Sequence, residues 1–236
     1  MTTLFAYPSN AAFGRVLPKS KIYERTQPTN AVKELFVRQV EQIVWQYKLA
    51  PETINVQGTA AVPEIQIFHI TLKTGELKQE VLCCIDQAIP FPLIFELYHE
   101  GKVKTIAAYK RPNEADAAKS VISPYFATDW LPEDTPRQPL PVVFDLEALY
   151  AQLLTPLLPY PPRQGESLPE QVDRMAEIEQ VQRELERCEA LLAKEKQFNR
   201  KVEINQNIKL ITGQILALTH ATPYNAGMLK ACMRRT

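Results

Sequence analysis

The chain has 236 residues, of which 45% are hydrophobic and 23% charged, a composition that excludes wholesale disorder. Its formal net charge of zero argues against a protein whose whole surface binds nucleic acid or acidic lipid. Its apolar runs are too short to span a bilayer, and its first residues lack the pattern of a secretion signal. We therefore expect a cytoplasmic protein with no membrane partner.

The N-terminal third is predicted to contain one amphipathic helix. Residues 1–20 include Pro8, Gly14 and Pro18, so we expect them to be extended. Thr29 and Asn30 are both good N-cap types, and a helix is predicted to follow them and to end at Ala50-Pro51. Its apolar residues recur at three- and four-residue spacing at Val32, Leu35, Phe36, Val40, Ile43, Val44 and Tyr47.

The middle of the chain predicts a mixed sheet. Residues 64–73 (EIQIFHITLK) alternate like a strand, and residues 77–89 have helical spacing that Pro90 stops. Residues 93–99 and 102–109 form a predicted hairpin around Glu100-Gly101, and residues 125–128 form a further short strand. Because helices and strands are interleaved here, we expect an α+β fold in which helices flank one mixed sheet.

Prolines mark the predicted domain boundary. Residues 131–141 contain four prolines and predict a stiff connector, and residues 142–158 predict a helix with Asp145 near its start. A second cluster, Pro159, Pro161 and Pro162, is followed by Gly165. We therefore expect a globular α+β domain over residues 1–158.

Residues 166–219 predict a long, charged, coiled-coil-like helical arm. Its apolar seam resumes out of phase at Ile204, which indicates either one long helix with a local irregularity, the interpretation we favour here, or a helical hairpin. A seam this narrow needs a covering surface, so we expect it to bind a protein partner or a second copy of the chain, although packing on the chain's own domain is the alternative. The predicted partner-binding residues are Ile178, Val181, Leu185, Cys188 and Leu192.

The motifs of the common catalytic classes are absent from the sequence. Its seven glycines are scattered, which removes the P-loop and the dinucleotide-binding fingerprint. The histidines lack metal-ligand spacing, and Cys83 and Cys84 lie in an apolar run typical of small buried thiols. We expect no cofactor, no metal and no catalytic residue.

One catalytic alternative is a divergent metal-dependent nuclease. Such enzymes hold Mg²⁺ with carboxylates on adjacent strands, and here the candidates are Glu64, Gln66 and Glu96. The acid-x-Lys spacing is missing, however, because Glu96 is followed by Leu97-Tyr98. The favoured interpretation is that all three side chains face solvent and alternate with core residues.

A small basic group accompanies the predicted hairpin. Lys102 and Lys104 lie within its second strand, and Lys110 and Arg111 follow it. These side chains are candidates for binding phosphate or DNA. The alternative, which we favour, is that they discourage aggregation through the edge of the sheet.

Several stretches resemble a bacterial and archaeal family labelled domain of unknown function four-three-nine-one. They are residues 17–20 (LPKS), 46–54 (QYKLAPETI), 85–90 (IDQAIP), 108–111 (AYKR) and 194–203 (KEKQFNRKVE). The resemblance covers nearly the whole chain and implies a setting beside DNA methyltransferases and helicases in restriction-modification-like defence loci. It implies no catalytic residues.

The leading hypothesis is a non-catalytic accessory subunit of such an antiphage defence system. Its arm would bind a DNA methyltransferase or helicase, or associate with a second copy. The alternatives are a nuclease subunit of the same system and an adaptor that binds DNA.

Overall fold

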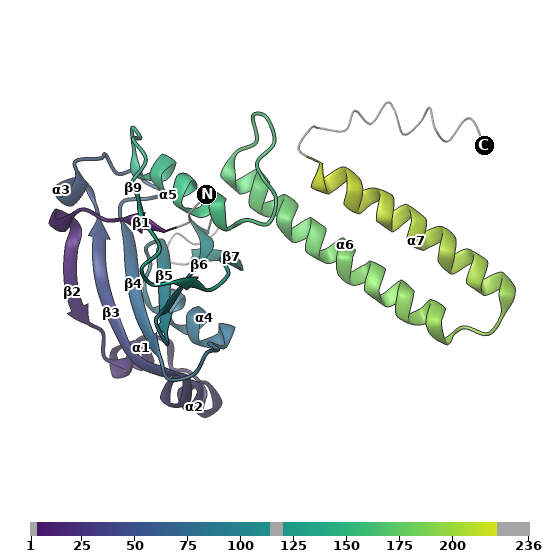
Figure 1. Ribbon diagram of the computed structural model, residues 1–236, viewed down its shortest axis with the longest axis horizontal. Helices are drawn as coiled ribbons and strands as arrows, with labels where there is room; N and C mark the ends of the chain where they lie inside the picture. The colour runs from purple at the N-terminus through teal and green to yellow at the C-terminus, as the bar shows by residue number, and fades with distance from the viewer. Residues whose placement is uncertain (1–3, 114–119, 221–236) are drawn as a thin grey trace. The chain divides into compact units, whose positions relative to one another are not determined.

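The computed structural model describes residues 4–113 and 120–220, and their contacts divide the chain into two compact units, Met1–Leu157 and Leu158–Thr236. The first unit holds a mixed sheet with helices, which confirms the predicted α+β fold (Figure 1). No helix in the described ranges is both long enough and apolar enough to cross a membrane.

The sheet of the first unit has the strand order β2-β3-β4-β5-β6-β7, with β8 paired to β6. Neighbouring strands are antiparallel except β4 and β5, which are parallel because helix α4 carries the chain across between them. The strands are β2 Ala12–Val16, β3 Val40–Leu49, β4 Ile65–Leu72, β5 Leu93–His99, β6 Lys102–Pro112, β7 Ser120–Ala127 and β8 Leu131–Pro132.

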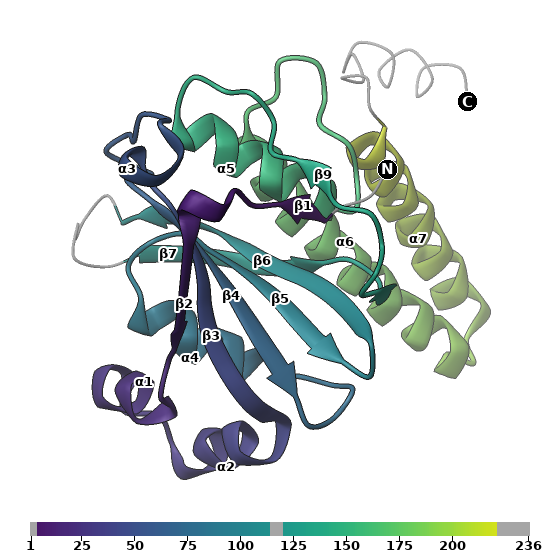
Figure 2. The ribbon, with the colours of Figure 1, turned by 60° about the vertical axis from the view of Figure 1, so that its left-hand side comes forward.

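Three helices pack against one face of this sheet: α1 Lys19–Thr26, α2 Asn30–Gln39 and α4 Gln79–Ala88. They bury Ile22, Phe36 and Ile85 against strand residues such as Phe68 and Phe95. β1 Phe5–Ala6 pairs with β9 Gln138–Pro139, and the pair crosses the opposite face (Figure 2). The remaining short elements of this unit are η1 Ser9–Ala11, α3 Pro51–Ile54, α5 Leu146–Leu154 and η2 Thr155–Leu157.

Several predicted elements are confirmed. β4, α4, β5 and β6 lie where the sequence pattern places them, and Glu100 and Gly101 form the hairpin turn with φ of 46° and 71°. Asp145 accepts a hydrogen bond from the backbone N–H of Ala148 at the start of α5, as an N-cap residue does.

The helix predicted to run from residue 30 to Ala50 is wrong in its second half. α2 ends at Gln39, and residues 40–49 are strand β3. Irregular pairing of β3 with β4, between Val40 and Gln42 and between Trp45 and Tyr47, breaks the strict alternation of a strand. Apolar residues therefore recur at a spacing that resembles a helix. Helix α1, which Pro18 precedes, also replaces the end of the predicted extended segment.

The second unit is a helical hairpin, so the favoured single long helix is wrong. α6 Leu168–Lys194 and α7 Phe198–Thr219 lie side by side and are joined by residues 195–197 (Figure 1). The carboxylate of Glu195 accepts from the backbone N–H groups of Lys196 and Gln197 in this turn. Along α6, Ile178 is buried and Val181, Leu185, Cys188 and Leu192 are half-buried.

Two arginines close the open end of the hairpin. Arg163 donates to the carbonyls of Ala217 and Leu218 at 2.6 and 3.1 Å, and Arg174 also donates to Leu218 at 3.1 Å. Arg174 is 5% exposed, and its guanidinium makes a two-bond ion pair with Glu166 at 2.6 and 2.8 Å. Cations at the C-terminal end of α7 satisfy carbonyls that lack helical partners.

Candidate functional site

The three predicted nuclease residues do not converge. Parallel pairing sets His69 of β4 beside Glu96 of β5, and sets Gln66 beside Leu93. Gln66 therefore shares the helix-covered face with Phe68, while Glu96 lies on the opposite face. The expectation that they face solvent is wrong for Gln66 and Glu96, which are 3% and 1% exposed. Among the described residues no group of three or more acids, histidines and cysteines is placed to hold a metal ion.

Glu96 is the centre of a polar cluster on the face that β1 and β9 cross. Arg137 donates to both of its carboxylate oxygens at 2.8 Å, and the Tyr98 hydroxyl donates to Oε2 at 2.6 Å. Nε2 of His69 lies 3.2 Å from the same oxygen. Arg137 also donates to the Phe5 carbonyl, so the cluster fastens β1 and the proline-rich connector to the sheet.

The electrostatics of this cluster oppose acid–base chemistry at Glu96. Burial alone would raise the pKa of Glu96, but hydrogen bonds from His69, Arg137 and Tyr98 outweigh burial and lower the pKa to about 2. Burial and the Glu96 charge together raise the pKa of the Tyr98 hydroxyl. Glu96 is thus ionised at neutral pH and occupied by its partners, which suits a structural anchor.

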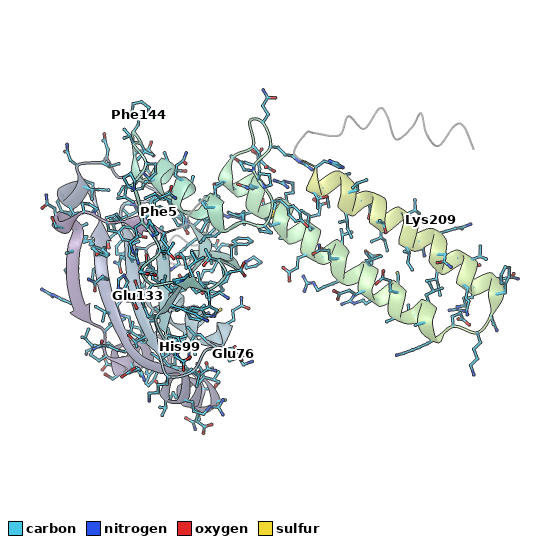
Figure 3. The ribbon with its side chains drawn as sticks, in the orientation of Figure 1. Phe5, Glu76, His99, Glu133, Phe144 and Lys209 are labelled. Carbon is cyan, nitrogen blue, oxygen red and sulfur yellow. The ribbon has the colours of Figure 1, made fainter. Side chains whose placement is uncertain are left out.

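A cleft of about 760 Å³ adjoins the cluster. His69 and Tyr98 line it together with His99 and Glu133, both labelled in Figure 3. The Glu96 carboxylate lies 3.2 Å from Nε2 of His69, and a carboxylate beside a histidine also occurs in general-base sites. Among the described residues that line this cleft there is no serine or cysteine, so they offer no His-activated nucleophile of these types.

The helix-covered face holds a second buried ion pair. Nζ of Lys110 lies 2.6 Å from Oδ1 of Asp86, and their side chains are 2% and 3% exposed. Lys110 also donates to the carbonyls of Asp86, Ile89 and Phe91, which closes the C-terminal end of α4. Burial raises the pKa of Asp86 and lowers that of Lys110, and each partner's charge opposes the shift.

This burial divides the predicted basic group. Lys110 is 3% exposed and lies in the core, so it offers no charge to a phosphate. Lys102 is exposed, and Lys104 and Arg111 are half-exposed, all on β6. Binding of nucleic acid by these three stays a prediction. The sequence did contain a signal for the ion pair, because Asp86 lies on the apolar face of α4 beside Leu82 and Ile85.

A second cavity, of about 490 Å³, opens beside α1 on the helix-covered face. Glu64 and Gln66 belong to its wall, together with the aromatic rings of Trp45, Phe68 and Phe91. The nuclease alternative assigns Glu64 and Gln66 to a metal, whereas in the structure they share this wall with aromatic and aliphatic side chains and with Lys21 and Arg25.

The arm carries exposed apolar residues outside its seam. Leu210 and Leu216 of α7 are 54% and 58% exposed, and Val202 is 41% exposed. Lys209, the single charged residue between positions 204 and 219, projects on the side of α7 away from α6 (Figure 3). α6, in contrast, carries charged residues along its whole length, seven acids and four bases.

The comparisons with known proteins give a family. The family described as Domain of unknown function (DUF4391) matches residues 5–215, which is most of the chain. No curated protein and no solved structure matches the chain.

Proposed function

This chain belongs to the DUF4391 family, and we propose that it is a non-catalytic accessory subunit of a restriction-modification-like defence system. Its helical hairpin docks onto a DNA methyltransferase or helicase of that system. The resemblance of the sequence to a family from such loci supports the setting, and the character of α7 supports the docking.

The observation that carries the proposal is the outer surface of α7. A helix that packs through one apolar seam normally carries charged or polar side chains on its opposite, water-facing side, because exposing apolar side chains to water is unfavourable. α7 instead exposes Val202, Leu210 and Leu216, and Lys209 is its single charge over residues 204–219. An amphipathic helix of a partner that lies along α7 would cover these groups.

The apolar stripe of α6, which the sequence predicts to bind the partner, has a different role in this proposal. Ile178 is buried, and the four residues that continue the stripe along α6 are half-buried. The stripe then holds α6 to α7, and the partner binds the outer surface of α7. Docking through the stripe itself requires the hairpin to open.

Co-purification of the full chain with a co-expressed methyltransferase or helicase tests the proposal. The double variant Leu210→Glu/Leu216→Glu should abolish co-purification, and the melting temperature of the α+β unit should stay unchanged. Gln180→Glu adds a carboxylate to the exposed surface of α6 and serves as the matched control. Retention of the partner by the double variant would remove α7 as the docking surface.

Two alternatives belong to the same system: a nuclease subunit and an adaptor that binds DNA. Mg²⁺-dependent cleavage by the purified chain, lost in Glu64→Ala or Glu96→Ala with the fold intact, would support the nuclease. A steep salt dependence of DNA binding, reduced in Lys102→Ala, would support the adaptor.

A further inference from the structure

The cavity beside α1 has the size and lining of a small-molecule site. Its volume of about 490 Å³ lies in the range of roughly 300–1,000 Å³ that is usual for ligand pockets. It is mostly apolar, and the sheet residue Phe68 and the helix residue Ile22, both buried, contribute to its lining. Pockets of this kind bind ligands through a flat apolar contact and a few well-placed polar groups.

Aromatic rings supply the flat contact. Trp45 and Phe91 line the cavity from a strand and a loop, and both are half-buried, so each has a surface left for a ligand. The Trp45 ring stacks on Phe68 with centroids 6.2 Å apart, and it packs on Phe13 at 4.1 Å. These neighbours hold the indole in place, which lowers the entropic cost of stacking a planar ligand on it.

Glu64 and Gln66 supply a polar edge with a defined pattern. The Gln66 amide donates one N–H to Oε1 of Glu64, and Lys48 lies 3.2 Å from Oε2. The Glu64 carboxylate keeps lone pairs for further donors, and the Gln66 amide keeps a second N–H and its carbonyl oxygen. A complementary ligand edge presents two adjacent N–H donors for the carboxylate and one acceptor for the amide.

The rim of the cavity is basic. Lys21 and Arg25 of α1 lie there one helical turn apart, and the Lys21 side chain is 64% exposed. Arg25 is anchored by a hydrogen bond of 3.0 Å to the Ala88 carbonyl. Lys21 pairs with Glu24 on the surface, a contact that a stronger anion can replace.

We propose that this cavity binds a guanine base together with its phosphate. Guanine presents adjacent N1–H and N2–H₂ donors beside the O6 acceptor, which matches the Glu64 carboxylate and the free N–H of Gln66. Its ring packs against the Trp45 and Phe91 side chains that line the cavity, and the phosphate reaches Lys21 and Arg25. The base comes either from a free nucleotide or from an unstacked position of a single strand. This site is formed by residues of the first unit alone and does not depend on the proposed docking.

Tryptophan fluorescence measures binding directly. The chain has two tryptophans, Trp45 and Trp130, so the variant Trp130→Phe leaves Trp45 as the sole reporter in the cavity. In this background guanosine monophosphate should quench the emission saturably, and at least about tenfold more tightly than uridine monophosphate, which lacks the amino group. A guanine-containing single-stranded oligonucleotide is the second probe: tighter binding than the mononucleotide identifies a strand as the source, and equal or weaker binding identifies the free nucleotide.

Two variants test the assigned contacts. Glu64→Gln should weaken guanosine monophosphate about tenfold or more, since a charge-assisted pair is lost. Lys21→Ala should weaken guanosine monophosphate several-fold and leave guanosine, which has no phosphate, unchanged. Arg38→Ala, an exposed basic residue of α2 outside the cavity lining, is the matched control. Thermal melting confirms that each variant is folded. The proposal is overturned if no saturable quenching occurs up to about 1 mM, or if the guanine and uracil nucleotides bind equally.

Discussion

The two faces of the sheet each bury an ion pair, and the two pairs differ in kind. Asp86–Lys110 lies on the helix-covered face with side chains 3% and 2% exposed, whereas on the other face Glu96 is buried and Arg137 is 27% exposed. Burial raises the pKa of Asp86, but it fails to raise that of Glu96, which has three donors and a pKa of about 2.

The difference indicates what each pair does for the fold. Lys110 caps the end of a helix, because it donates to three carbonyls at and just beyond the last turn of α4. Arg137 holds the proline-rich connector in place, because it bonds both Glu96 of the sheet and the Phe5 carbonyl of β1. The first pair completes the core, and the second fastens the layer that crosses the opposite face.

Removal of Lys110 should have the largest effect. Lys110→Met leaves the Asp86 carboxylate and the α4 carbonyls buried without their cation, so we expect about 3–5 kcal/mol of lost stability. Urea unfolding followed by tryptophan fluorescence measures this, because Trp45 and Trp130 both belong to the α+β unit. Lys104→Met, a half-exposed residue of the same strand, should cost less than about 1 kcal/mol. Equal effects of the two substitutions would contradict the comparison.

Glu96→Gln should cost less, about 2–3 kcal/mol, because Arg137 can turn partly toward water once its partner is neutral. The amide still accepts one hydrogen bond but leaves part of the guanidinium unpaired. A further readout is local: protease cleavage within residues 131–141 should accelerate, since Arg137 no longer fastens the connector. Lys110→Met should not accelerate this cleavage before global unfolding.

The two carboxylates should respond to acid with opposite signs. The pKa of Glu96 falls from 4.5 to about 2 on folding, so its stabilisation is present above pH 4.5 and is lost as the pH falls toward 2. Folding raises the pKa of Asp86, so the contribution of this group to stability is fully present below pH 3.8 and is lost as the pH rises through its pKa in the folded state. Between pH 4.5 and 3 we therefore expect Glu96→Gln to lose about 1–2 kcal/mol less than the wild type. Asp86→Asn should lose more stability than the wild type over this interval, and urea midpoints at each pH decide the matter.

An element of this fold can be predicted from the sequence where its signal is local. β4, α4 and the β5–β6 hairpin were predictable because their periodicity and turn residues lie within single segments. β3 was not, because its register irregularities depend on β4, and these obscure the β-branched and aromatic content of Val40, Ile43 and Trp45. The sequence left two alternatives for the arm, because a break in the phase of its apolar pattern fits a turn between two helices as well as an irregularity within one helix.

The candidate sites show the same limit. Which face a strand residue occupies depends on pairing between segments, so the separation of Glu96 from Gln66 could not be read from their spacing. The sequence groups Lys110 with Lys102, Lys104 and Arg111, because its partner Asp86 lies on a different element. Trp45 lies in the part of the predicted helix that forms strand β3 instead, and only this strand places it at the cavity beside α1.

The smallest expected effect separates the two roles of Lys110. If pairing with Asp86 were its main role, the double variant Asp86→Asn/Lys110→Met would recover most of the loss, because a neutral pair needs no counter-charge. However, Lys110 also satisfies three carbonyls, and methionine donates to none of them. We therefore expect the double variant to be more stable than Lys110→Met alone by only about 1–2 kcal/mol. Asp86→Asn alone is the remaining variant of this double-mutant cycle. In it, the oxygen of the new amide would still accept the hydrogen bond that the Tyr125 hydroxyl now donates to Oδ2 of Asp86. Full recovery in urea unfolding would show that the cap on α4 contributes little, and no recovery would show that the Asp86 charge is harmless in the core without its partner.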